Sequence, residues 1–273
     1  MAKLRPIAGG NTGNQEPTTE LAVERMLNSL VTEGRDHRER LPAPRMRSNH
    51  RANFDPGTIG ATEPMVAAAI RNVLSRYELS AGQTVPRSIA VVSALRGEGV
   101  TTISKSLAHV LASDFSATVC WVDLSWAGSG GSSSRESESQ HPGICELLTG
   151  ELTIQDALEP SDNARLSLLS AGRVSDGHRY ALSRSAKLGD ALQDLKDQFD
   201  FVIFDTAPVL TSGDALALLL HADACLLVAR HGVTTAGQIA ATAHELQKIP
   251  TIGAILNQHR SKTPRFVRRL FDE

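Results

Sequence analysis

The residues best suited to chemistry in this sequence form a short turn, Gly97-Glu-Gly-Val-Thr101. An apolar segment rich in β-branched residues precedes the turn, and apolar residues recur at helical spacing after it, so the expected order is strand, turn and helix. Glycines let the backbone approach a ligand closely, and a helix N-terminus offers unpaired N–H groups and a partial positive charge. These features are suited to binding phosphate.

The turn predicts a P-loop, whose standard form is G-x-x-x-x-G-K-[ST]. Ala94 stands at the first glycine position, Gly99 at the second, Val100 at the lysine position and Thr101 at the hydroxyl position. Backbone amides could still bind phosphates and Thr101 could still reach Mg²⁺, but no ammonium stands where the β- and γ-phosphates would be held. Losing such a charge-assisted hydrogen bond costs roughly 1.5–3 kcal/mol, about a ten- to hundred-fold loss of affinity. Whether this loop binds a nucleotide is therefore left open by the sequence.

Two aspartates follow apolar segments further along the chain. Asp123 lies near the end of 117–124, and Asp205 follows the run that begins at Phe201. In P-loop proteins Mg²⁺ is held by the loop hydroxyl and by an aspartate at the end of a neighbouring strand. Thr101 and Asp205 are therefore the predicted metal ligands. A single aspartate at a strand end usually marks only the point where the chain leaves the core. The prediction therefore depends on the order and spacing of the loop, Asp123 and Asp205 together.

Composition limits the classes of function. The chain has 273 residues, 41% of them hydrophobic, which is enough for one full core with residues left for appendages. A net charge of -2 gives no overall attraction to nucleic acid, and no nucleic-acid partner is expected. Cys120, Cys145 and Cys225 lie in apolar runs without paired metal-ligand spacing, so we expect buried, reduced thiols in a cytosolic protein. Polar residues follow the first six, so we expect no secretory signal.

The elements that would position these groups alternate along the chain. We expect helices at 62–77, after the P-loop, at 143–149 and 153–158, within 181–199, and at 213–221 and 234–247. We expect strands from 88, and at 117–124, 166–170, 201–208, 224–229 and 251–257. Continuous apolar strands separated by helices indicate an α/β fold, with a mainly parallel sheet covered by helices on both faces. Ligands of such sheets bind at the carboxyl ends of the strands.

The flanking segments have little apolar periodicity. Residues 1–61 are expected to form a largely disordered, flexible arm, with a candidate short helix at 19–32 that either docks a partner or frays in solvent. The Gly/Ser tract at 125–140 is expected to be a mobile surface loop. The short basic tail at 261–273 carries apolar anchors that could touch anionic lipid, although a solvated end is the plainer interpretation. The globular domain is expected to span 62–260.

Several motifs resemble those of the bacterial tyrosine kinases (BY-kinases) of capsule and exopolysaccharide export, which belong to the Min/Par-type P-loop superfamily. They are the run Gly97-Glu-Gly-x-Thr-Thr, the strand ending in Asp123, the apolar segment before Asp205-x-x-Pro208, and the endings Leu226–Thr234 and Gly253–Asn257. The resemblance covers about residues 62–260. It implies ATP and Mg²⁺ as cofactors, a membrane polysaccharide co-polymerase or other export component as partner, homo-oligomers, and a cytoplasmic place at the inner face of the cell membrane.

The resemblance also assigns site residues. It implies Thr101 for magnesium, Asp123 as the first aspartate of the Walker-A′ motif and the candidate catalytic residue, and Asp205 as the Walker-B aspartate. The implied nucleotide-binding residues are Arg96, Gly97, Glu98, Gly99, Val100, Thr101, Thr102 and Asn257, the last of them near the adenine.

The sequence departs from the family at several independent places. Val100 replaces the P-loop lysine, Ser125 the second Walker-A′ aspartate and Ala127 an arginine of that motif. Residues 65–71 keep only Arg71 of the family's oligomerisation motif. The family's C-terminal tyrosine cluster is missing, because the only tyrosines are Tyr77 and Tyr180. Either Lys105, reaching back one turn, or Arg96 could supply the lost positive charge.

The leading interpretation is a degenerate BY-kinase-like protein that regulates or scaffolds polysaccharide production, with lost or much reduced kinase activity. One alternative is an active ATP-dependent tyrosine autokinase that uses a substitute cation. A second is a Min/Par-like positioning ATPase, which the Asp205-Thr-Ala-Pro208 form disfavours. The plainest alternative is a relic turn that binds nothing inside a stable α/β core.

Overall fold

The computed structural model describes residues 63–82, 84–126, 142–172 and 180–258. The expected arm at 1–61, its helix at 19–32 and the basic tail at 261–273 lie outside the described residues, as does the Gly/Ser tract from 127 onwards.

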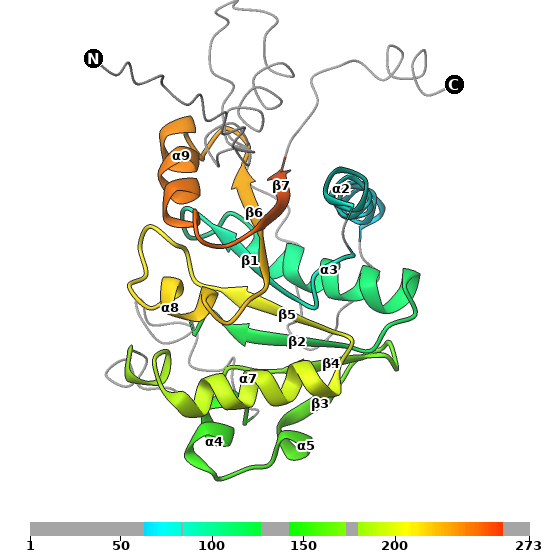
Figure 1. The fold of residues 1–273 in the computed structure, drawn as a ribbon, viewed down its shortest axis with the longest axis vertical. Helices are drawn as coiled ribbons and strands as arrows, with labels where there is room; N and C mark the ends of the chain where they lie inside the picture. The colour runs from blue at the N-terminus through cyan, green and yellow to red at the C-terminus, as the bar shows by residue number, and fades with distance from the viewer. Residues whose placement is uncertain (1–62, 83, 127–141, 173–179, 259–273) are drawn as a thin grey trace, which may run out of the picture. The chain divides into compact units, whose positions relative to one another are not determined.

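A seven-stranded sheet forms the centre of the described residues (Figure 1). The strand order is β3-β4-β2-β5-β1-β6-β7. The strands are β1 Ser88–Ser93, β2 Val119–Leu124, β3 Leu158–Pro160, β4 Leu166–Leu169, β5 Phe201–Thr206, β6 Ala224–Arg230 and β7 Thr251–Asn257. All neighbours pair in parallel except β3, which is antiparallel to β4. The predicted mainly parallel α/β sheet is confirmed.

Helices alternate with the strands. They are α2 Pro64–Ala81, α3 Val100–Asp114, α4 Ile144–Thr149, α5 Ile154–Ala157, α7 Ala186–Gln198, α8 Ala215–Leu219 and α9 Ala236–Glu245. Capping residues determine where several helices begin and end. The hydroxyls of Ser185 and Thr235 accept hydrogen bonds from N–H groups in the first turns of α7 and α9, and Gly82, in the left-handed region, ends α2. The long apolar stretch at 215–229 is a core helix followed by a core strand, as predicted. No helix of the described ranges is long and apolar enough to cross a membrane.

One short element was not predicted. The segment expected to be helical to 158 ends its helix at Ala157, and Leu158 begins the edge strand β3. Its three residues, Leu-Glu-Pro, carry no alternating apolar pattern, and proline is tolerated only at a sheet edge. The antiparallel pairing with β4 therefore depends on tertiary contacts that the local pattern does not reveal.

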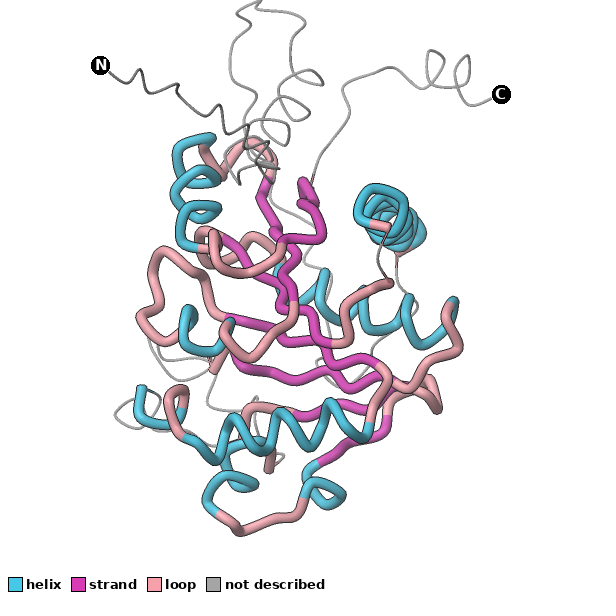
Figure 2. Tube along the Cα trace, viewed as in Figure 1, coloured by secondary structure: helices cyan, strands magenta, loops and turns pink. Residues whose placement is uncertain are grey.

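Both faces of the sheet are covered, which Figure 2 shows as helices on either side of the strands. In β5, Ile203 packs into the cluster beneath α3, while its neighbours Val202 and Phe204 point to the opposite face and are equally buried. All six residues of β1 are buried. This explains why the central strands read as continuous apolar runs rather than as alternating patterns.

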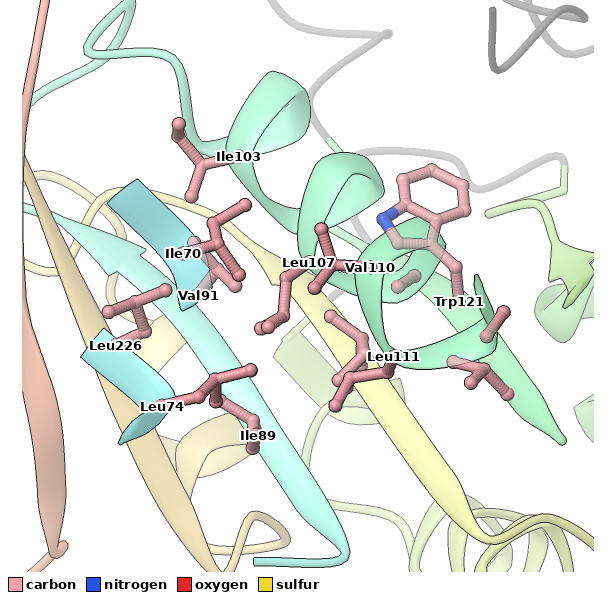
Figure 3. Close-up of a cluster of buried hydrophobic side chains, with 14 of the residues drawn as sticks. Ile70, Leu74, Ile89, Val91, Ile103, Leu107, Val110, Leu111, Trp121 and Leu226 are labelled. Carbon is pink, nitrogen blue, oxygen red and sulfur yellow. The ribbon is translucent and has the colours of Figure 1, made fainter. Parts of the chain in front are cut away.

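A large apolar cluster fixes the helix that follows β1. Ile70 and Leu74 of α2 meet Leu107 and Leu111 of α3 above the strands (Figure 3), and each of these side chains is at most 2% exposed. Burying a side chain of this size contributes about 1.5–3 kcal/mol. The cluster therefore holds the N-terminus of α3 firmly at the carboxyl end of β1.

Candidate phosphate-binding site

The turn between β1 and α3 has the backbone of an anion-binding nest. Gly97 and Gly99 have φ values of 83° and 98°, a left-handed region that glycine adopts at little cost. Gly99 is also the N-cap of the 15-residue helix α3, and no side chain among the described residues caps that end. The first N–H groups of α3 thus point at the carboxyl edge of the sheet, where an anion would be held. The predicted strand, turn and helix are present.

The buried side chain of Glu98 stabilises the turn through hydrogen bonds. This side chain is only 1% exposed, and its carboxylate accepts a hydrogen bond from the Leu95 N–H at 3.1 Å. Its other oxygen accepts from the hydroxyl of Thr234, which follows β6. The Thr234 hydroxyl also accepts from the Arg230 N–H at 2.8 Å. Because its carboxylate is engaged within the protein, any contact of Glu98 with a nucleotide would come from its backbone.

Asn257, the last residue of β7, packs on the same turn. Its side-chain Nδ2 donates to the Glu98 carbonyl at 2.9 Å. A Cβ added to Gly99 would lie 2.1 Å from that nitrogen, so glycine is needed at position 99 for space as well as for φ. The described contacts of Asn257 hold the turn, and its proximity to an adenine stays a prediction.

Asp123 and Asp205 are register partners on the neighbouring strands β2 and β5. Asp205 is 1% exposed, and neither carboxylate oxygen has a hydrogen-bond partner within the described chain. Asp123 is partly buried and accepts from the backbone N–H and the hydroxyl of Ser125 at 2.9 Å and 2.7 Å. Ser125 therefore donates to the carboxylate of Asp123 where the family pattern places a second aspartate.

The electrostatics of this pair follow from burial and proximity. Burial, and then the charge of Asp123, raise the pKa of Asp205 well above its ordinary value, against the opposing effects of the Thr101 hydroxyl and of Lys105. Burial also raises the pKa of Asp123, against the hydrogen bonds from Ser125. Two carboxylates in this position require a cation nearby, or one of them must hold a proton.

Thr101 and Asp205 fit a magnesium ion. A buried carboxylate without partners is costly unless a cation pairs with it, and Mg²⁺ typically takes one or two carboxylates together with substrate phosphates. The Thr101 hydroxyl lies close enough to Asp205 to lower its pKa. No group of three or more metal-ligating His, Cys, Asp or Glu side chains occurs in the described part of the chain. A magnesium ion here would take phosphate oxygens and water as its remaining ligands.

The lysine position of the loop is filled by an apolar side chain, Val100. Val100 is partly buried and packs against the apolar cluster beneath α2 and α3. Arg96 and Thr102 are exposed. Lys105 is only 6% exposed, with its ammonium 4.7 Å from the centroid of the Trp121 ring on β2. The ammonium of Lys105 therefore lies against β2, and its role as a substitute for the loop lysine stays a prediction.

Two interactions were not predicted from the sequence. Arg230 at the end of β6 approaches the Gly97 carbonyl, with its guanidinium nitrogen at 3.5 Å. Arg71, the one residue kept from the oligomerisation motif, forms two bonds with Asp114 of the same chain, at 2.6 Å and 3.2 Å. For the contact between Arg230 and Gly97, the sequence offers one indication, the Leu226–Thr234 ending. That ending resembles a family motif but does not predict a contact with the loop.

Comparison with known proteins agrees with this geometry. Residues 86–254 match the family model described as AAA domain. The tyrosine-protein kinase Etk of Escherichia coli is 26% identical over 234 residues, which span 83% of this chain. The tyrosine-protein kinase YwqD of Bacillus subtilis is 26% identical over 216 residues, or 78% of the chain and 90% of YwqD. The succinoglycan biosynthesis transport protein ExoP of Rhizobium meliloti is 25% identical over 204 residues, or 73% of the chain and 26% of ExoP.

The solved kinase domain of Escherichia coli Etk has the same fold. It superposes with a TM-score of 0.63 at 22% identity, covering 79% of this chain and 88% of that domain. The chain spans only 32% of the length of full Etk. The part of Etk that superposes on this chain is the solved kinase domain.

Proposed function

Because this chain belongs to the AAA domain family and its relatives include bacterial tyrosine kinases, we propose that it binds a nucleotide as a regulatory or scaffolding protein of polysaccharide production, with lost or much reduced kinase activity. The proposed ligand is ATP, bound at the nest formed by 97–101 with or without Mg²⁺. Thr101 and Asp205 are the proposed metal ligands, Asp123 is the proposed catalytic carboxylate, and Arg96, Thr102 and Asn257 flank the nucleotide.

The observation that carries this proposal is the contrast between an intact loop and a missing charge. Gly97 and Gly99 keep the backbone of an anion site, while Val100 packs against the apolar cluster at the position of the lysine. Phosphoryl transfer depends on positioning and charge neutralisation at the γ-phosphate. A loop that keeps its backbone donors but lacks this ammonium is expected to retain binding better than catalysis.

The role in polysaccharide production comes from the relatives. ExoP is named as a succinoglycan biosynthesis transport protein. We propose by analogy that this chain works in exopolysaccharide or capsule production, at the inner face of the cell membrane beside a membrane co-polymerase or other export component. Pull-down of a tagged chain from its own cells, followed by identification of membrane proteins of polysaccharide export, tests this part.

Nucleotide binding and phosphoryl transfer are measured separately. Isothermal titration of the purified chain with ATP, with Mg²⁺ present, should give saturable binding. Incubation with γ-labelled ATP should give neither labelled protein nor released phosphate above a protein-free blank. Absence of binding would support the relic-turn alternative.

An active tyrosine autokinase is the second candidate, favoured by the preserved Thr101, Asp123 and Asp205. In that case Tyr77 or Tyr180 would have to accept phosphate, since the sequence has no other tyrosine. Tyr180 is exposed in the described structure, which makes it the more accessible acceptor. Label on either residue, abolished by Asp205→Asn, would support this candidate.

A further inference from the structure

Lys105 is a buried cation at the edge of the proposed site. It lies in the second turn of α3, is 6% exposed, and holds its ammonium 4.7 Å from the centroid of the Trp121 ring. The Trp121 Nε1–H donates to the Ser104 hydroxyl at 2.9 Å, which fixes the ring under the helix. A buried ammonium is costly unless negative charge compensates for it. Its position therefore requires carboxylates nearby.

The geometry places the acid pair on the same side as this ammonium. Thr101 and Lys105 are four residues apart on α3 and so share one helix face. Trp121 and Asp123 are two residues apart on β2 and so share one face of the sheet. Asp205 is the register partner of Asp123, and Ile203, two residues earlier on β5, packs in the cluster beneath α3. The ammonium of Lys105 and the carboxylates of Asp123 and Asp205 thus face the space between α3 and the sheet.

The charge balance of this space supports the same placement. Burial lowers the pKa of Lys105, while Asp205, then Asp123, then Glu159 of β3 raise it. The negative charges of Asp205 and Asp123 thus favour the charged form of Lys105. Two carboxylates with one ammonium leave one negative charge where the pair alone would present two, so a phosphate chain at the neighbouring nest is repelled less.

We propose that the Lys105 ammonium is the resident cation of the Asp123–Asp205 pair, so that the nest at 97–101 binds the phosphates of a nucleoside triphosphate without requiring a divalent ion. The inference rests on the proposed nucleotide binding and specifies its metal dependence. Mg²⁺ can still join Thr101 and Asp205, but phosphate binding does not depend on it.

The test compares ATP binding to the wild-type full chain by isothermal titration in EDTA and in MgCl₂. The dissociation constants are expected to differ by less than about tenfold, because the ammonium already supplies a charge-assisted interaction in the absence of metal. Binding in Mg²⁺ with none in EDTA would overturn this inference and leave the proposed function standing. Absence of binding under both conditions would overturn both.

A variant pair gives a second, independent measurement. Lys105→Met keeps an unbranched side chain over the Trp121 ring but removes the charge, and should weaken ATP binding in EDTA by about ten- to hundred-fold, with much of the loss restored by Mg²⁺. The matched control is Lys187→Met, an exposed lysine on α7, which should leave both constants unchanged. Equal binding of wild type and Lys105→Met in EDTA would overturn the inference. If Lys105→Met does not fold, as judged by tryptophan fluorescence, the wild-type comparison decides alone.

Discussion

The side-chain amide of Asn257 donates a hydrogen bond of 2.9 Å to the backbone carbonyl of Glu98, across 159 residues of sequence. With the bond from the Thr234 hydroxyl to the Glu98 carboxylate, it fastens the loop after β1 to the ends of β6 and β7. None of these bonds involves the side chain at position 100. The loop can therefore keep an anion-binding shape after the loss of its lysine.

Gly99→Ala should damage the loop more than an ordinary glycine replacement. Its φ of 98° is strained for alanine, and its Cβ would lie 2.1 Å from Asn257 Nδ2. Such strain costs about 1–3 kcal/mol before the clash is counted, and ATP binding should be lost. Gly82→Ala is the control, because Gly82 also has a positive φ but no atom of the described residues lies within 4 Å of the added Cβ. Urea unfolding measures both variants, and equal losses of stability would contradict the account.

Val100→Lys should restore the missing charge. ATP affinity measured by isothermal titration should rise by about ten- to hundred-fold, as expected for one charge-assisted hydrogen bond. Val100→Met, which adds length without charge, should show no comparable gain. An unchanged affinity in Val100→Lys would mean that the loop has lost its geometry as well as its charge.

Asp205→Asn should stabilise the ligand-free protein at neutral pH. Burial raises the pKa of Asp205 well above 3.8, so the native state holds this proton more tightly than the unfolded chain does. The resulting stabilisation is complete below about pH 3.8 and is lost as the pH rises through the raised value. Asparagine removes the buried charge, so the free energy of unfolding at pH 7 should rise by about 1 kcal/mol or more.

The control for this variant is Asp162→Asn, an exposed carboxylate, which should leave stability unchanged. Urea unfolding at several pH values should also show a flatter pH dependence for Asp205→Asn than for wild type. A destabilised Asp205→Asn would contradict this prediction, because two carboxylates beside Lys105 would then stabilise the folded chain more than Asp123 alone does.

The three cysteines should be unreactive in the folded protein. Cys120, Cys145 and Cys225 are all buried. Burial raises the pKa of Cys225 to about 11 and that of Cys120 further still, so little thiolate forms at pH 8. Thiol labelling should proceed only at the rate of unfolding and reach three groups in urea. Rapid labelling without denaturant would contradict the burial of these residues.

Much of the fold could be predicted because continuous apolar strands and capped helices leave strong local signals. The segment after the P-loop, the strand that carries Asp205 and the last strand before Asn257 all form as expected. The edge strand at Leu158 could not be predicted, since three residues have no periodicity and their pairing depends on a partner contributed by tertiary structure.

The candidate site was predictable in its parts but not in its connections. The sequence indicates Asp123 and Asp205 as strand-final carboxylates, yet their register pairing depends on how the sheet is ordered. It gives no sign that Glu98 is buried and bonded to Thr234, because a glutamate in a polar turn is ordinarily solvated. Lys105 could be placed on the helix but not against Trp121, since that contact joins two elements.

Nucleotide binding without phosphoryl transfer is best tested by measuring ATP binding and γ-phosphate transfer in parallel on one wild-type preparation. We expect saturable binding by isothermal titration, with no labelled protein and no released phosphate above the blank. Efficient labelling of Tyr77 or Tyr180 from γ-labelled ATP would contradict it, because the loop would then catalyse transfer without its lysine.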